Sequence, residues 1–120
     1  MRKPSSFSIL AAGAAWRLLG ARGPGETLLA ALAGEDEQNR MLAGMSLVRG
    51  GQRSFELIER KLRAGKASAA ALRLLPDIDE SKSRAVMEQV VEHGPDELRG
   101  TARDCLDLLD RMEASESDAE

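Results

Sequence analysis

The residues best suited to chemistry in this sequence are one histidine and one cysteine. His93 directly precedes Gly94 at the expected end of a helix, where the helix dipole favours an imidazolium. Cys105 falls on an apolar helical stripe. An activated cysteine needs a neighbouring group that lowers the thiol pKa, and a metal site needs several ligands. We therefore expect His93 to be a capping or surface residue and Cys105 a small buried one, with no cofactor and no metal.

A second candidate is the acidic stripe formed by Asp104, Asp107 and Asp110. Carboxylates could bind a divalent cation. However, Arg103 and Arg111 each lie four residues from Asp107, which is the spacing of helical ion pairs. We therefore interpret the stripe as a solvated helix face. The sequence has no Walker loop, no G-x-G-x-x-G and no zinc-ligand spacing, so we expect a protein that is not an enzyme.

The charge balance favours a protein partner over a nucleic acid. The net charge is −3, and residues 95–120 carry nine acidic and three basic groups. Nucleic-acid binding needs a basic surface, which this pattern does not supply. A single cysteine cannot form an internal disulfide and suits a reducing compartment. We therefore expect a cytoplasmic protein that binds another protein.

The apolar run at residues 7–19 has two interpretations. With two basic residues ahead of it and an A-x-A site at 12–14, it resembles a secretory signal. Arg17 interrupts the run, and Trp16 lies beside the proposed cleavage site. We favour a packed helix with Trp16 turned inward, which could also be a self-association surface. The run is too short to span a bilayer, so we expect no membrane span.

Two stretches of the sequence match when they are offset by 29 residues. Residues 54–65 (SFELIERKLRAG) align with residues 83–94 (SRAVMEQVVEHG), and Ser54 matches Ser83. A period of this size is typical of stacked helical repeats. An Ala-x-x-x-Leu pair, which lies on one helix face, recurs before, between and after these stretches. Its copies are Ala15 with Leu19, Ala43 with Leu47, Ala71 with Leu75, and Ala102 with Leu106.

The glycines, prolines and apolar spacing predict an all-α fold of seven helices. Strand signals are missing. We expect a disordered segment at 1–7, an α-solenoid at 8–112 and a disordered acidic tail at 113–120. Pro76 should end the fifth helix, and Asp79 should cap the sixth. The expected helices cover residues 7–19, 26–33, 35–48, 52–64, 66–75, 79–92 and 96–112.

These paired helices, with Ala-x-x-x-Leu in the first and a closing glycine in the second, resemble the HEAT-repeat family over residues 8–112. The units span 28–31 residues, shorter than the usual ~40–47. They are nearer to the short HEAT-like repeats of bacterial proteins, including those named after phycobilisome lyases. An armadillo-like or another helical repeat is an alternative. The resemblance implies a right-handed α-solenoid that binds proteins on a concave face of second helices, with no catalytic residues.

The resemblance also implies that residues 52–64 and 79–92 turn their polar sides to the concave face. A solvated, ion-paired face is the simpler interpretation, because Glu56–Arg60 and Glu59–Arg63 have helical pair spacing. Arg63 should also lie beside Glu92. We expect a protein-binding adaptor or scaffold; the alternative is an accessory protein of the phycobilisome-lyase class. The candidate partner-binding residues are Arg53, Glu56, Glu59, Arg60, Arg63, Arg84, Glu88 and Glu92.

Overall fold

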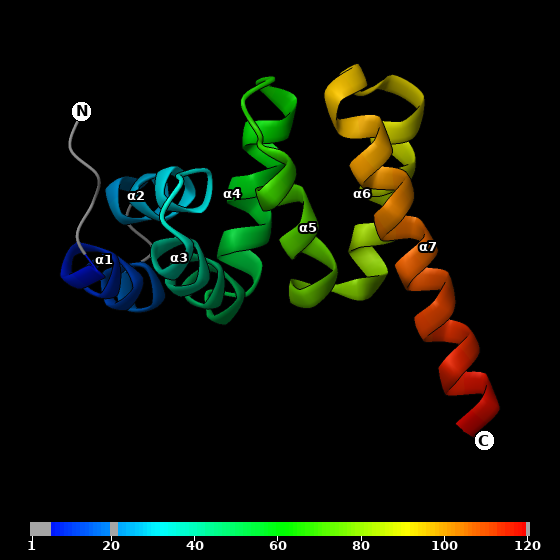
Figure 1. Cartoon of the computed structure of the whole chain (residues 1–120), viewed down its shortest axis with the longest axis horizontal. Coiled ribbons are helices and arrows are strands. Elements are labelled where there is room, and N and C mark those ends of the chain that lie inside the picture. Colours follow the sequence, from blue (N-terminus) through cyan, green and yellow to red (C-terminus); the bar gives the residue numbers. More distant parts are fainter. Residues whose placement is uncertain (1–5, 20–21, 120) are drawn as a thin grey trace.

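The computed structural model describes residues 6–19 and 22–119, which form seven α-helices (Figure 1). No strand occurs in these two ranges, so the all-α prediction is confirmed. The molecule measures 43 × 34 × 25 Å. The helices are α1 (Ser6–Leu19), α2 (Arg22–Leu32), α3 (Glu37–Arg49), α4 (Gln52–Arg63), α5 (Ala69–Ile78), α6 (Glu80–His93) and α7 (Asp96–Ala119).

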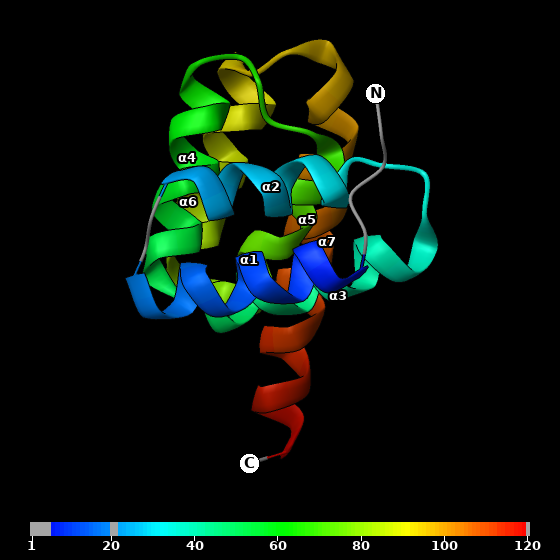
Figure 2. The same ribbon diagram turned by 90° about the vertical axis from the view of Figure 1, so that its left-hand side faces the viewer.

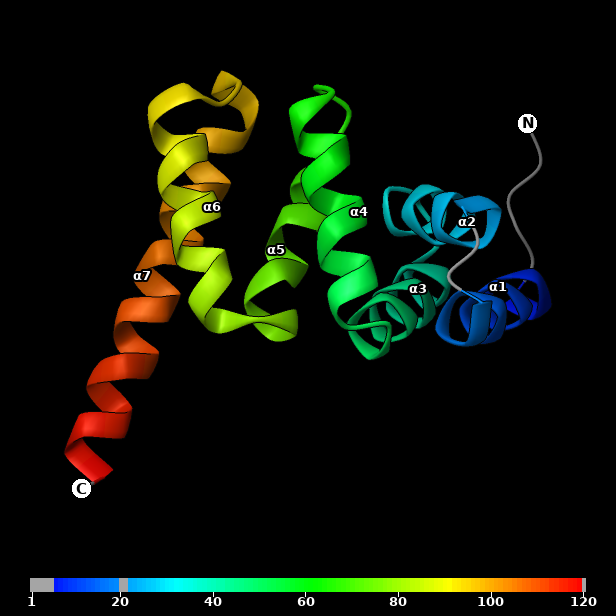
Figure 3. The ribbon, with the colours of Figure 1, turned by 180° about the vertical axis from the view of Figure 1, so that it is seen from behind.

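The helices form two groups that run in different directions. Helices α1, α2 and α3 all pack on one another and cross the direction of the later helices (Figure 2). From α4 to α7 the chain alternates in direction, with α4 and α6 on one side and α5 and α7 on the other (Figure 3). The end of α7 projects beyond the other helices. The change of direction between α3 and α4 occurs at Gly51, whose φ of 60° suits a residue without a side chain.

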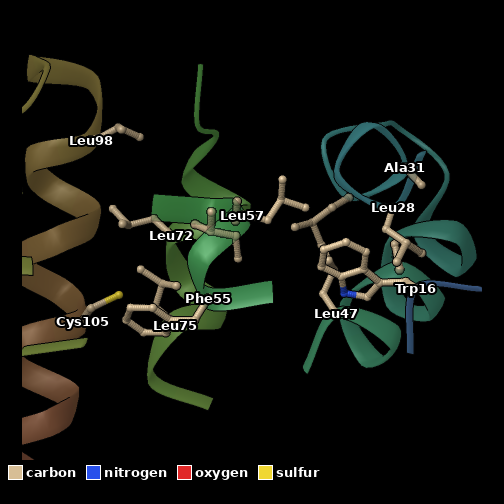
Figure 4. Packing of buried hydrophobic residues seen from close by; sticks show 14 of the residues in the cluster. Trp16, Leu28, Ala31, Leu47, Phe55, Leu57, Leu72, Leu75, Leu98 and Cys105 are labelled. Atoms are coloured by element: carbon tan, nitrogen blue, oxygen red, sulfur yellow. The ribbon is translucent and has the colours of Figure 1, made fainter. Parts of the chain in front are cut away.

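The core follows the repeat that the sequence predicted. Leu47 and Leu75, at matching positions of the Ala-x-x-x-Leu series, are both fully buried. Ser54 and Ser83, which match in the other series, are also fully buried. The buried side chains form one continuous cluster from α1 to α7 (Figure 4). The helices are individually too short to be stable in water, so this shared burial stabilises all of them together.

Trp16 joins the two groups of helices. Its side chain is 3 % exposed, and its indole Nε1 donates a buried hydrogen bond of 2.7 Å to Ser54 Oγ on α4. Two glycines provide the space for the indole ring. A Cβ atom on Gly25 would lie 2.9 Å from Trp16, and one on Gly50 would lie 2.5 Å from Trp16 Nε1. The prediction that Trp16 packs inward is confirmed, and its partner is a serine from the repeated stretch.

Helix α2 begins earlier than expected. We expected a break at residues 20–25, of which 20 and 21 lie outside the described residues, but the helix starts at Arg22. Pro24 is then the third helical residue, where a missing N–H costs no intrahelical hydrogen bond. The glycine at position 25 allows close approach to Leu57, whose Cδ2 would lie 2.8 Å from an added Cβ. Glycine and proline therefore serve helix entry and packing here and do not form a loop.

Helix α5 runs through Pro76, which we expected to end it. The helix spans Ala69–Ile78, and Ser68 caps it by accepting a hydrogen bond from the Ala71 backbone at 3.2 Å. A proline removes one hydrogen bond to the carbonyl four residues earlier. In the last turn this loss is confined to one bond. The backbone N–H of Asp79 still donates to the Leu75 carbonyl at 2.9 Å, and the helix closes there.

Helix α7 continues through 113–119, where we expected an irregular acidic tail. Arg84 of α6 provides a physical reason, because it bonds Asp110 at 2.9 Å and Glu113 at 3.1 Å. These contacts hold the helix across the point where we expected it to end. At the other end, α1 already includes Ser6 and Phe7, and residues 1–5 lie outside the described residues.

Replacement of Ser54 tests the connection between the two helix groups. The Ser54→Ala variant would leave the buried indole N–H of Trp16 unpaired, which we expect to cost about 1–3 kcal/mol of unfolding free energy. The control is Ser83→Ala. The Ser83 hydroxyl donates to the Asp79 carbonyl of its own helix at 2.6 Å, and this carbonyl also accepts the Ser83 backbone N–H at 3.1 Å.

Urea denaturation of both variants provides the measurement. The unfolding free energy should fall more in Ser54→Ala than in Ser83→Ala. The effect of Ser54→Ala should be smaller when it is introduced into a Trp16→Phe variant. Equal losses in the two serine variants would show that the hydrogen bond to Trp16 contributes nothing beyond serine burial.

Candidate functional site

The predicted partner-binding residues lie on α4 and α6, which are neighbours on one side of the molecule (Figure 3). Both helices run in the same direction, so their C-terminal ends lie at the same end of this side. We call this surface the α4–α6 face and define it by the eight predicted residues. Arg53, Glu56, Arg60, Arg63, Glu88 and Glu92 are exposed, whereas Glu59 and Arg84 are half-buried.

The ion pairs that we considered for this face do not form. Within the described residues, neither Glu56 with Arg60 nor Glu59 with Arg63 comes within the 4.0 Å of an ion pair, and Arg63 does not reach Glu92. Glu92 instead lies 3.6 Å from His93. The prediction of internal ion pairing on this face is therefore wrong. Most of its charges face solvent and could pair with groups of another molecule.

Arg53 and Arg84 are held by the chain itself. The guanidinium of Arg53 donates to the Trp16 carbonyl at 3.5 Å. Arg84 bonds Asp110 and Glu113, and its hydrogen bond to Asp110 raises the guanidinium pKa above its ordinary value. These two arginines therefore contribute to the packing of α4 against α1 and of α6 against α7. The remaining charged residues form the open part of the face.

A polar network fixes one end of the α4–α6 face. Gln52 of α4 donates to the Asp79 carboxylate at 3.0 Å and accepts from Lys82 Nζ at 2.8 Å. Asp79 caps α6, as predicted, by accepting from the Lys82 backbone at 3.0 Å. Sequence reasoning found the cap but missed Gln52. The only sequence signal for this contact was that Gln52 begins α4, the helix that matches α6 one repeat earlier.

The opposite end of the face carries a hollow of about 270 Å³ between the C-terminal ends of α4 and α6. Its apolar part comes from Leu62 and Val90, and Arg63, Gln89 and His93 supply polar groups. One cation, one amide and one imidazole around an apolar floor could bind a side chain or a carboxylate of a peptide. The structure therefore places the predicted Arg63 beside a depression rather than on a flat surface.

The histidine and the cysteine occupy different environments. His93 is a surface residue, with 73 % of its side chain exposed, and Cys105 is buried at 5 %. Both predictions are confirmed. Burial raises the pKa of the Cys105 thiol above its ordinary value. No group of three or more His, Cys, Asp or Glu residues in the described part of the chain could hold a metal ion.

The acidic stripe of α7 is used in part by the structure. Asp110 bonds Arg84, whereas Asp104 and Asp107 are exposed. Among the residues that are described, neither Arg103 nor Arg111 forms an ion pair with Asp107. The stripe is thus a solvated face, as we interpreted it, but Asp110 forms an ion pair with Arg84 of α6.

A second surface, which sequence reasoning missed, lies between α3 and α5. Met41 and Met45 are 59 % and 47 % exposed there, one turn apart on α3, beside a hollow of about 480 Å³. The signal was present in the sequence. Met41, Met45 and Val48 follow helical spacing on a side of α3 other than that of Leu47. We assigned α3 one apolar stripe, whereas it has two.

Comparison of the chain with protein-family models, with curated proteins and with solved structures gave no match. Across the described residues, no helix has both the length and the apolar character that crossing a membrane requires.

The buried thiol gives a reactivity prediction. Because Cys105 is enclosed and its pKa is raised, we expect slow reaction with a thiol reagent such as DTNB in native buffer and rapid reaction in urea. The control is a Cys105→Ala, Ser115→Cys variant, whose thiol sits at an exposed position. Fast labelling of native Cys105, at the rate of this control, would contradict the buried placement.

The Asp79 cap gives a pH prediction. The hydrogen bond from the Lys82 backbone lowers the pKa of Asp79 below its ordinary value. A lowered folded-state pKa contributes stability that is present above the unfolded pKa and is lost as pH falls through the folded pKa. We expect Asp79→Asn, which keeps a capping side chain, to lose less stability than wild type between neutral and strongly acidic pH.

Urea unfolding at a series of pH values measures this difference. Asp107→Asn serves as the control, because it removes an exposed carboxylate that forms no ion pair with a described residue. An Asp79→Asn variant with the same acid dependence as wild type would show that the cap does not respond to protonation.

Proposed function

We propose that this chain is a non-enzymatic protein-interaction module that binds a partner segment on the α4–α6 face. The observation that supports it best is the unpaired state of the charges there. Arg60, Arg63 and Glu88 are exposed and form no ion pair with any described residue. Local helix stability favours such charges in pairs at i, i+4. Unpaired cations and anions on adjacent helices are suited to pair with a partner.

The architecture that we propose is a short HEAT-like α-solenoid of antiparallel helix pairs. Two features support it. Helices α1, α3, α5 and α7 each pack on the next member of that series, as the first helices of stacked pairs would. Several matching residues of the two repeat series are buried alike, namely Leu47 with Leu75, Ser54 with Ser83, and Ile58 with Met87. The turn at Gly50 and Gly51 then divides the stack into two parts with different directions.

The charges on this face are distributed unevenly between its two helices. On this face the last turn of α4 carries Arg60 and Arg63, whereas the corresponding part of α6 carries Glu88 and Glu92. Because both helices run the same way, these opposite charges lie toward the same end of the face, where Arg63 lines the hollow. A partner segment that presents acids toward α4 and bases toward α6 would match this pattern. Such complementarity sets orientation and specificity more than affinity.

An affinity pull-down from the source lysate, read by mass spectrometry, tests this proposal. Wild type is compared with an Arg60→Glu, Glu88→Lys variant, which reverses both charges and keeps the net charge. The matched control is Arg103→Glu, Asp107→Lys on α7, where both residues are exposed and form no ion pair with each other. We expect a partner that is retained by wild type and by the control but lost by the α4–α6 variant.

Two results would contradict the proposal. Equal retention of a partner by all three proteins would exclude the α4–α6 face as its binding site. Loss of the partner in the α7 control variant alone would show that the partner binds α7. Circular dichroism of each variant establishes that the helices are retained.

A further inference from the structure

The groove between α3 and α5 is separate from the α4–α6 face, because none of its lining residues belongs to α4 or α6. Exposed apolar side chains that gather in one place on a soluble domain mark an interaction surface more often than scattered ones do. Methionine suits such surfaces because its side chain is flexible and polarisable. The groove is lined by Leu32, Arg40, Met41, Gly44, Met45, Val48, Arg49, Leu74 and Asp77.

The groove combines protruding side chains with a hollow floor. Met41 and Met45 stand out from α3, and Gly44 lies buried between them and α5. A Cβ atom on Gly44 would lie 3.7 Å from Leu32 and from Leu74, which is ordinary van der Waals contact. The fold therefore does not require a glycine here, unlike at Gly25 and Gly50. Because Gly44 has no side chain, the floor of the groove stays accessible between Met41 and Met45.

Arg40, one of the three charged residues that line the groove, already donates to the carbonyls of Gly34 and Glu35, and the other two are self-complementary. Arg49 on the α3 wall and Asp77 on the α5 wall are both exposed, and neither forms an ion pair with a described residue. In a two-fold dimer the same patch meets itself, so that residue i contacts j while j contacts i. Arg49 of each copy would then meet Asp77 of the other.

We propose that the occupant of this groove is a second copy of the chain. The two copies form a two-fold dimer in which Met41 and Met45 of each enter the hollow beside Gly44 of the other, with two reciprocal Arg49–Asp77 pairs. At about 1.5 Å per residue, α3 is roughly 20 Å long, so the contact that we propose is limited to a short groove. We therefore expect a dimer that dissociates on dilution.

Sedimentation velocity over about a hundredfold range of protein concentration measures this dimer. The Met45→Glu variant would bury an unpaired carboxylate, and we expect its dissociation constant to rise by about tenfold or more. The matched control is Leu108→Glu on α7, because Leu108 is exposed to almost the same extent, 45 % against 47 % for Met45. This control should dimerise like wild type.

Charge reversal tests the reciprocal pairs. Arg49→Asp alone places two acids opposite each other at both ends of the interface, and Asp77→Arg alone places two bases there. Each variant should therefore dimerise more weakly than wild type. When the two variants are mixed, both pairs become opposite again, so the mixture should associate more strongly than either variant alone. A mixture no stronger than its components would overturn the proposed arrangement.

Two further outcomes would overturn the proposal. Wild type that remains monomeric over the whole range would show that the groove is not a self-association site. The exposed side chain of Leu10 on α1 marks the other candidate surface. A dimer that survives Met45→Glu but is lost in Leu10→Glu would place self-association on α1. These results do not depend on the α4–α6 face, whose variants change no residue of the groove.

Discussion

The buried hydrogen bond from Trp16 to Ser54 is the constraint on which the arrangement of the two helix groups depends. It connects residues 38 positions apart, in helices that run across one another. Indole burial supplies a large apolar area, and its one N–H must find an acceptor. Ser54 provides that acceptor, and Gly50 provides the space. The turn at Gly51 lets α4 change direction, and the fit of Trp16 against Ser54 and Gly50 holds α4 against the first group.

The direction of α4 in turn decides which charges share a surface. Gln52 connects the start of α4 to Asp79 and Lys82 at the start of α6, so the two helices keep a common orientation. Arg84 then ties α6 to α7. These contacts fix the base of the α4–α6 face, whereas Arg60, Arg63 and Glu88 in its C-terminal half form no ion pair with a described residue. If two copies join through α3 and α5, the dimer carries two such faces, and a partner with two binding segments would gain avidity.

The sequence predicted the number of helices and several buried positions of the repeat but not several helix ends. Periodicity reports which residues share a helix face, which is why Leu47 and Leu75 were assigned correctly. Residues 20–25 were assigned as a break because they are rich in glycine and proline, and Pro76 was assigned as a helix end. Pro24 and Pro76 instead occupy terminal turns, where a missing N–H costs little. The ion pairs of the α4–α6 face were also expected from spacing alone. Spacing permits a pair, but solvent competes for exposed charges and the gain is small.

What the sequence could not indicate is which distant surfaces meet, and Gly44 illustrates the reason. In the Ala-x-x-x-Leu series, the residue after the alanine is Trp16 in α1, Gly44 in α3 and Leu72 in α5. All three positions are buried. Trp16 and Leu72 fill their space with large side chains, whereas Gly44 leaves space at the floor of the groove. An omitted side chain in α3 therefore leaves a groove, because residues of α2 and α5 maintain the walls around it.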